Sequence, residues 1–481
     1  MLIWKTQTLN VNVASVRYRC LLPLKYLAKR GVHQTIFGGG DPVKITPQTA
    51  AIVFVKSFRN QDIETCKQAE QLGVPIILDL CDNIFIEEYA LGKEYVPADN
   101  FRRMVERAAA IVTTGEALKK EIERAIAPLN LSIPIVVIPD GSETLLDIDE
   151  AFQITRGQRL VSLVLRPALK RSTKPFRRAI AAVSRLSTRV RKAKVRMRKA
   201  IRRRYKESRL TERQKLKHKR EARGQEARGQ EARGQEARER QEALQTSTEA
   251  IVKPDVHTEV SAKVQPTPFF PDSWPVAAPQ TKTILWFGNH GAKYGSFGMS
   301  SILDVAPAIE KLSQEQALRL VVVSNSHDKY ERFVEPLPFE THYLRWHPRA
   351  IYSYIEYSDV VIIPNSQSVY SICKSANRAV LSLSQSTPVV ASRTPALDLF
   401  AGCVVLDDWE GGLRQYLLNP ELGQTHVALA QQAIAQNLSG DKIAQQWLAV
   451  LEKVANPASA VPADAIAHQM TGTPAEQGSR V

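Results

Sequence analysis

Residues 359–392 constrain the fold more than any other part of the chain, because they contain two apolar runs with a helical pattern between them. Val360 to Ile363 is a short β-branched run that ends at Pro364, and Val389 to Ala391 is a second run of this kind. Short apolar runs without alternation are typical of interior parallel strands, which are covered on both faces. The segment therefore predicts a strand–helix–strand unit of a parallel sheet.

A cationic cluster lies between these two strands. Lys374, Ser375, Asn377 and Arg378 immediately precede the apolar-periodic stretch 379–383, so we expect them on the first turn of a helix. Exposed N–H groups and added positive charge at a helix start favour an anion. The alternative is a solvated helix start at which Lys374 and Arg378 are surface charges that bind no ligand.

A glycine-rich turn follows another predicted strand, residues 284–287. It contains Gly288, Gly291, Gly295 and Gly298, together with Asn289 and Lys293. Glycines let backbone N–H groups approach phosphate oxygens without a Cβ in the way. The spacing is not that of a dinucleotide fingerprint, so the turn indicates a phosphate site of another type or, alternatively, only a flexible turn.

Two carboxylates, Asp79 and Asp82, lie at the end of the predicted strand 75–80. This is the carboxyl end, where α/β sheets bind their ligands. Either carboxylate could orient an acceptor hydroxyl or act as a general base. The alternative is that they form a turn or cap a helix.

The basic charge of the chain is confined to one segment. The 481 residues have a net charge of +16, but residues 156–240 hold 31 Lys and Arg against 7 Asp and Glu, which leaves 34 against 42 elsewhere. The five cysteines are scattered at positions 20, 66, 81, 373 and 403, without metal-ligand spacing. We therefore predict neither a zinc site nor a disulfide framework.

That basic segment interrupts two α/β halves. Within it, EARGQ repeats from Glu221; a five-residue period advances about 140° per repeat on a helix, which excludes a coiled-coil seam. Residues 175–203 form a basic amphipathic pattern that could lie on anionic lipid, pack on a domain or, as the weakest option, bind nucleic acid. We expect domains at 1–150 and 281–456, with a basic helical and disordered linker at 151–280 and a disordered tail at 457–481.

The cationic cluster reads K-S-A-N-R and precedes a P-V-V-A strand, and this resembles a K-S-x-N-R subgroup of the GT-B-type glycosyltransferases. The resemblance implies an α/β fold of two Rossmann-like domains that face each other across a cleft, with the basic insertion in the interdomain linker. It also implies that Lys374 and Arg378 bind the donor diphosphate and that Lys293 faces the same phosphates. The remaining donor-site residues would be Gly288, Asn289, Gly291, Ser375 and Asn377.

Two further matches lie in the first half. Arg17 and Arg19 fit the S-x-R-Y-R stretch of the subgroup, which implies that they bind a phosphate or an acidic sugar. Pro139, Asp140 and Gly141 resemble the P-N-G turn at which these enzymes leave their first domain. The acidic turn with Asp79 and Asp82 would face the acceptor.

The sequence departs from the broader class at three positions. Cys373 and Leu381 stand where retaining members have a pair of glutamates, and Ser386 replaces a glycine. The resemblance implies transfer from a UDP- or GDP-linked sugar to a glycan or lipid-linked acceptor, without a metal or other cofactor and with retention. The missing glutamates leave a second hypothesis: a catalytically degenerate fold that binds membrane or nucleic acid through its basic insertion.

The start of the chain lacks an apolar core of signal-peptide length, and nowhere are there about 18 consecutive apolar residues. We therefore expect a cytoplasmic protein, with peripheral attachment to the inner face of the membrane as an option.

Overall fold

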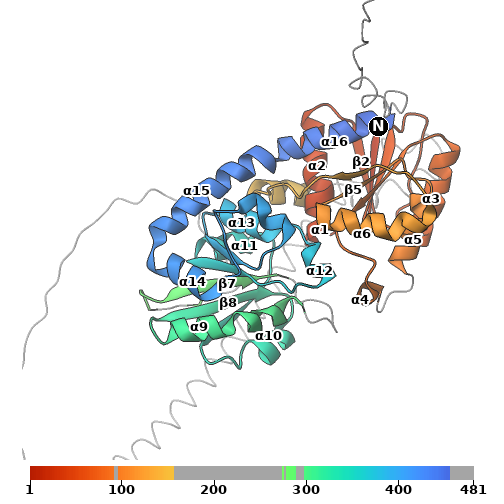
Figure 1. Cartoon of the computed structure of the whole chain (residues 1–481). Helices are drawn as coiled ribbons and strands as arrows, with labels where there is room; N and C mark the ends of the chain where they lie inside the picture. Colours follow the sequence, from red (N-terminus) through yellow and green to blue (C-terminus); the bar gives the residue numbers. More distant parts are fainter. Residues whose placement is uncertain (91–95, 156–273, 276–277, 289–296, 456–481) are drawn as a thin grey trace, which may run out of the picture. The chain divides into compact units, whose positions relative to one another are not determined.

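The computed structural model describes residues 1–90, 96–155, 274–275, 278–288 and 297–455. Two α/β domains account for these residues (Figure 1). The amphipathic pattern at 175–203, the EARGQ repeats and the tail at 457–481 lie outside the described residues. Predictions made for those three segments therefore remain predictions.

The first domain contains six parallel strands. They are β1 (Leu2–Thr6), β2 (Gln34–Gly38), β3 (Ala51–Val55), β4 (Ile76–Leu80), β5 (Ala110–Thr113) and β6 (Ile135–Val137). Their order is β2-β1-β3-β4-β5-β6, so the direction of winding reverses between β1 and β3. This is the flavodoxin-like order extended by one strand, in which ligands bind at the carboxyl ends beside the reversal.

Helices form most of the connections between these strands, since parallel strands need a crossover connection. They are α1 (Ala14–Val16), the π-helix η1 (Arg17–Leu21), α2 (Leu22–Lys29), α3 (Asn60–Gln71), α4 (Glu87–Ala90), α5 (Pro97–Val105), α6 (Glu116–Ile126) and the 3₁₀-helix η2 (Ala127–Leu129). Residues 145–155 are also helical.

The second domain also has six parallel strands. They are β7 (Lys282–Phe287), β8 (Leu318–Ser324), β9 (Glu340–Arg345), β10 (Val360–Ile363), β11 (Val389–Ala391) and β12 (Val405–Leu406). Their order, β12-β11-β10-β7-β8-β9, is the Rossmann order 3-2-1-4-5-6 read from the other edge. Its reversal point lies between β7 and β10.

The helices of the second domain complete the doubly wound arrangement. They are η3 (Met299–Asp304), α9 (Ala306–Ser313), α10 (His327–Phe333), α11 (Ala350–Glu356), α12 (Val369–Ile372), α13 (Asn377–Ser384), η4 (Pro395–Phe400), α14 (Trp409–Leu418), α15 (Pro420–Asn437) and α16 (Gly440–Ala455).

Apolar side chains cover both faces of each sheet. In β3, Ile52 and Phe54 belong to the cluster on one face, and Val53 and Val55 belong to the cluster on the other. This alternation follows from the two-residue period of a strand. The predicted fold class, two Rossmann-like α/β domains, is confirmed by these two covered parallel sheets.

The last helix returns to the first domain. α16 lies beside α2 (Figure 1), and Trp447 of α16 meets Trp4 of β1 edge-on, with ring centroids 5.1 Å apart. Both indole side chains are fully buried. The carboxyl-terminal helix therefore completes the core of the amino-terminal domain.

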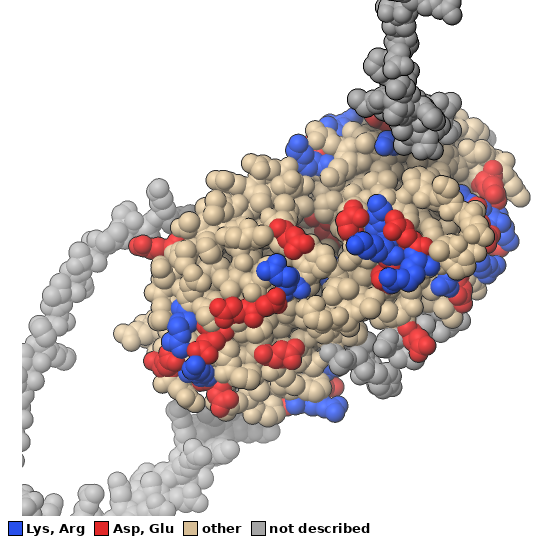
Figure 2. Space-filling model, viewed as in Figure 1, with Lys and Arg blue, Asp and Glu red and all other residues tan. Residues whose placement is uncertain are grey.

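The described face carries charges of both signs, and Figure 2 shows acidic and basic side chains intermixed on it. None of the described helices combines the length and the apolar character needed to cross a bilayer.

Candidate anion site at the domain junction

Arg378 lies at the reversal point of the second sheet. Its guanidinium donates from Nη2 to Oδ1 of Asn365 at 2.8 Å and from Nη1 to the carbonyl oxygen of Phe287 at 3.4 Å. Phe287 ends β7 and Asn365 follows β10, so Arg378 joins the carboxyl ends of the two strands that flank the reversal. Doubly wound sheets bind their ligands at this position.

The partners of Arg378 leave its charge unneutralised. Within the part of the chain that the structure describes, no carboxylate accepts a hydrogen bond from this side chain. Burial lowers the pKa of Arg378 to about 10, which still leaves it cationic at neutral pH. A cation held by two neutral oxygens retains its attraction for an anion.

Gly288, the first glycine of the predicted phosphate turn, is a neighbour of this guanidinium. A Cβ at this position would lie 3.4 Å from Nη1 of Arg378 and 3.4 Å from the Trp286 ring, at the edge of ordinary van der Waals contact on both sides. Gly288 therefore lies directly beside the cation. The rest of the predicted phosphate turn, including Asn289, Gly291 and Lys293, lies outside the described residues.

One prediction about the cationic cluster is wrong in its local structure. α13 begins at Asn377 with Ala376 as its N-cap, so Lys374 and Ser375 precede the helix instead of lying on its first turn. The reason is a separate short helix, α12, whose N-cap Ser368 accepts a hydrogen bond from the backbone of Ser371. Of the four predicted residues, only Asn377 and Arg378 occupy the helix start.

The link between α12 and α13 holds the second domain to the first. Cys373 is buried within a core cluster of the first domain. Ser375 donates a hydrogen bond to Oδ2 of Asp140 at 2.6 Å. Lys374 forms an ion pair with Asp82. Lys374 and Arg378 were predicted to bind the same diphosphate. In the structure, Lys374 pairs with the first domain through Asp82, whereas Arg378 binds Asn365 of its own domain.

Asp82 lies between two lysines. Lys374 binds its Oδ1 and Lys56, which follows β3, binds its Oδ2. Burial raises the pKa of this carboxyl, but the two ammonium groups outweigh that effect and hold the pKa well below its usual range. A carboxylate with so low a pKa is a poor proton acceptor, so this geometry does not support Asp82 as a general base.

Asp79 and Arg19 form a fully buried ion pair. Nη2 of Arg19 lies 2.6 Å from Oδ2 of Asp79, and the exposed fractions of the two side chains are 1% and 0%. Nη1 of Arg19 also donates to the carbonyl oxygen of Ile138 at 2.6 Å and approaches Asp140 at 3.4 Å. The positions of Asp79 and Arg19 therefore disagree with the roles predicted from the resemblance, because neither side chain is open to a substrate.

Arg17 is likewise engaged within the protein. Its Nε lies 2.8 Å from Oε1 of Glu143, and Nη1 donates to the carbonyl oxygen of Val11 at 2.8 Å. The π-helix η1 contains both arginines, and the wider turn of such a helix often occurs at functional positions. In this structure it directs the two arginines into buried pairs, so Arg17 also lacks the exposure that substrate binding needs.

Sequence reasoning missed three polar residues of the junction: Lys56, Glu143 and Asn365. Lys56 has one sequence signal, since it directly follows a fully apolar strand at a carboxyl end. Asn365 has the same signal after β10. Glu143 has none, because its partner Arg17 is 126 positions away.

The positions expected to hold glutamates are core positions in this chain. Cys373 is 4% exposed and Leu381 is 7% exposed. Leu381 lies within α13 and packs into the core of the second domain. Their burial explains why apolar side chains occupy both positions.

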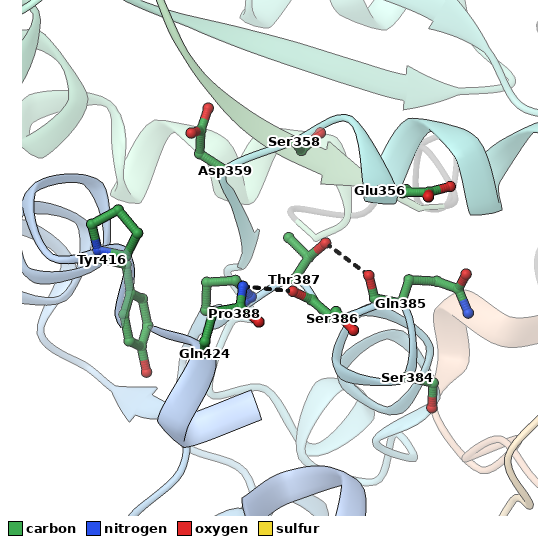
Figure 3. Close-up of a pocket in the computed structure, with 11 residues that line it drawn as sticks. Glu356, Ser358, Asp359, Ser384, Gln385, Ser386, Thr387, Pro388, Tyr416 and Gln424 are labelled. Atoms are coloured by element: carbon green, nitrogen blue, oxygen red, sulfur yellow. Dashed lines mark hydrogen bonds between the residues drawn. The ribbon is translucent and has the colours of Figure 1, made fainter. Parts of the chain in front are cut away.

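A large open hollow of about 540 Å³ lies elsewhere (Figure 3). Its lining includes Asp359, which precedes β10, and Thr387 and Pro388, which precede β11. It therefore lies at the amino ends of the strands, opposite the edge that binds ligands in such sheets. Its lining residues also bind one another, as when the side chain of Gln424 donates to the backbone carbonyl oxygen of Ser386 at 3.3 Å (Figure 3).

The sequence matches no protein-family model and no curated protein. Among solved structures, the chain is similar to HepE of Anabaena with UDP and glucose, at a TM-score of 0.48 and 10% identity over 94% of this chain and 99% of that one. It is also similar to a glycosyltransferase of Rickettsia africae, at a TM-score of 0.45 and 11% identity over 94% of this chain and 98% of that one. A third similar structure is an alpha,alpha-trehalose 6-phosphate synthase of Burkholderia multivorans, at a TM-score of 0.43 and 12% identity over 90% of this chain and 74% of that one.

The strand order of this chain defines its fold. Both sheets are parallel, each reverses its winding once, and the last helix returns from the second domain to the first. The chain therefore has the two Rossmann-like domains of the GT-B type of fold.

Proposed function

We propose that the protein is a glycosyltransferase that moves a sugar from a UDP- or GDP-linked donor to a glycan or lipid-linked acceptor. The observation that carries the proposal is the position of Arg378, an unneutralised cation beside Gly288 at the reversal point of a Rossmann-order sheet. A diphosphate is the anion that such a position fits best, because amide dipoles and a fixed guanidinium share its charge.

The proposed chemistry follows from where charge develops. As the bond between the sugar and the diphosphate breaks, negative charge grows on the leaving oxygen. Preorganised cations stabilise that charge without a metal ion, and Arg378 is already in place for this role. Metal independence, and retention as the stereochemical outcome, are parts of this proposal.

Calorimetric titration of the full-length protein with UDP and GDP tests the donor site. We expect Arg378→Gln to weaken binding of the preferred nucleotide by at least about tenfold, because a charge-assisted contact is lost. Arg393→Gln is the matched control, since Arg393 is 60% exposed and its side chain pairs with Asp407 at 3.7 Å.

The thermal transition of Arg378→Gln should stay unchanged or rise, because the substitution removes a cation whose burial is unfavourable. Unchanged nucleotide affinity in a folded Arg378→Gln variant would contradict the site.

A second candidate function is a catalytically degenerate GT-B fold that acts as a scaffold through its basic insertion. The burial of Cys373 and Leu381 at the expected glutamate positions favours it. Purified protein incubated with a panel of sugar nucleotides separates the two candidates. Release of nucleotide supports the transferase, whereas complete inactivity together with tight binding to anionic vesicles or nucleic acid supports the scaffold.

A further inference from the structure

Three charged residues form a cluster that the donor site does not use. Lys56 follows β3 of the first domain, Asp82 follows β4, and Lys374 comes from the second domain. Their exposed fractions are 20%, 15% and 35%, so each side chain is partly accessible to solvent. With two ammonium groups and one carboxylate, this Lys56 cluster has a net charge of +1.

The geometry of the cluster matches that of a bound oxyanion. Each lysine binds a different oxygen of the same carboxylate, so the two ammonium groups span the Asp82 carboxylate. A phosphate group has a similar separation between its oxygens, but it offers three acceptor oxygens and a charge near −2 at neutral pH. A phosphate monoester would therefore satisfy both lysines better than the single negative charge of Asp82 does.

The surroundings of the two lysines favour a binding role over a merely structural one. Lys56 has a φ of 46°, in the left-handed region that side chains rarely adopt. Backbone strain of this kind costs about 1–3 kcal/mol and clusters at ligand sites. Aromatic rings support both ammonium groups, with Lys374 4.0 Å from the ring centroid of Tyr370 and Lys56 5.5 Å from that of Tyr89.

The cluster is also separate from the donor cation. Lys56 lies at the carboxyl end of β3, which flanks the reversal point of the first sheet, whereas Arg378 lies at the reversal point of the second. Lys374 donates a hydrogen bond to Asp82 and Arg378 donates one to Asn365, although Lys374 and Arg378 are only four positions apart in the sequence. Each sheet thus presents its own cation at the edge where ligands bind.

We propose that the Lys56 cluster binds a phosphate monoester on the acceptor substrate, with Asp82 occupying the site until the phosphate displaces it. The assignment to the acceptor rests on the proposed glycosyltransferase function, whereas phosphate binding does not. The acceptor is therefore a phosphorylated sugar or a lipid-linked phosphate, not a neutral glycan.

Calorimetric titration of the full-length protein with methyl phosphate, in the presence of saturating UDP, tests the proposal. We expect wild-type protein to bind methyl phosphate, and we expect Lys56→Gln and Lys374→Gln to weaken that binding by about tenfold or more. Asp82→Asn should strengthen it several-fold, because the competing carboxylate is gone. The control Lys67→Gln, which alters an exposed lysine paired with Glu64, should change nothing.

Arg378→Gln separates this proposal from the donor assignment. It should weaken UDP binding by at least about tenfold and leave methyl phosphate binding unchanged, so that the loss of each ligand is measured independently. Methyl phosphate that fails to bind, that competes with UDP, or that binds folded Lys56→Gln as well as wild type would overturn the proposal, as would weaker binding by Asp82→Asn.

Sedimentation with vesicles distinguishes the two sources of phosphate. Vesicles that contain phosphatidic acid should sediment wild-type protein but not Lys56→Gln if the acceptor phosphate is lipid-linked. If the acceptor is a soluble sugar phosphate, glucose 6-phosphate should bind in a Lys56-dependent way and glucose should not. Absence of Lys56 dependence in both assays would overturn the proposal.

Discussion

Two arginines at the carboxyl ends of the sheets differ in what balances their charge. Arg19 has Asp79 and Asp140 as partners, so its guanidinium is neutralised within the first domain. Arg378 has an amide oxygen and a backbone carbonyl. Both arginines were predicted to bind a phosphate or another acidic group, and only their partners in the structure distinguish a structural cation from one that can hold a ligand.

At the residue scale, we predict that Arg19→Met destabilises the protein by about 3–5 kcal/mol, because it leaves the buried Asp79 carboxylate without its main partner. Urea unfolding measures the effect. The double variant Arg19→Met with Asp79→Leu should recover part of the loss, and the exposed control Arg393→Met should stay within about 0.5 kcal/mol of wild type. Equal stability of Arg19→Met and wild type would show that the buried pair is dispensable.

At the element scale, the strands that sequence predicted best are those buried on both faces. β10 and β11 were predicted at their observed bounds, Val360–Ile363 and Val389–Ala391, because their apolar runs have sharp ends. β9 was missed, since its sequence ETHYLR is mostly polar and it lies at a sheet edge.

The candidate site was predictable to a similar extent. Arg378 could be identified because its environment is local: a strand, a glycine and a helix start within one domain. The buried state of Arg17, Arg19 and Asp79 could not, because their partners lie 60 to 126 positions away in the chain. A local sequence pattern cannot indicate an ion pair between residues so far apart in the chain.

The return of α16 to the first domain gives a second element-scale prediction. A Cβ at Gly440, the first residue of α16, would overlap the ring of Tyr26 in the first domain. Gly440→Ala should therefore destabilise the protein by about 1–3 kcal/mol in urea unfolding.

Gly115→Ala is the matched control for this change. No atom lies within 4 Å of a Cβ at Gly115, so its stability should stay close to wild type. A Gly440→Ala variant as stable as Gly115→Ala would show that α16 does not press on Tyr26.

At the scale of the whole molecule, the two domains are joined by charge as well as by apolar contact. Asp82 of the first domain pairs with Lys374 of the second, and Ser375 donates to Asp140. The same contacts place a titratable carboxylate at the junction. The free energy of unfolding should therefore depend on pH through the titration of Asp82.

The direction of this dependence follows from the lowered pKa of Asp82. A carboxyl whose pKa is lower when folded stabilises the protein above its unfolded pKa, about 3.9, and this contribution is lost as the pH falls towards the folded value. Wild type should exceed Asp82→Asn in free energy of unfolding by about 1–3 kcal/mol at pH 6, and the difference should shrink towards pH 2. A difference that is constant with pH would contradict the lowered pKa.

A crystal structure of the full-length protein with UDP would locate the donor site. We expect a phosphate oxygen of UDP to lie within hydrogen-bond distance of the Arg378 guanidinium, beside Gly288 and between the ends of β7 and β10. UDP bound in the hollow at the amino ends of β10 and β11, or bound with no contact to Arg378, would contradict it.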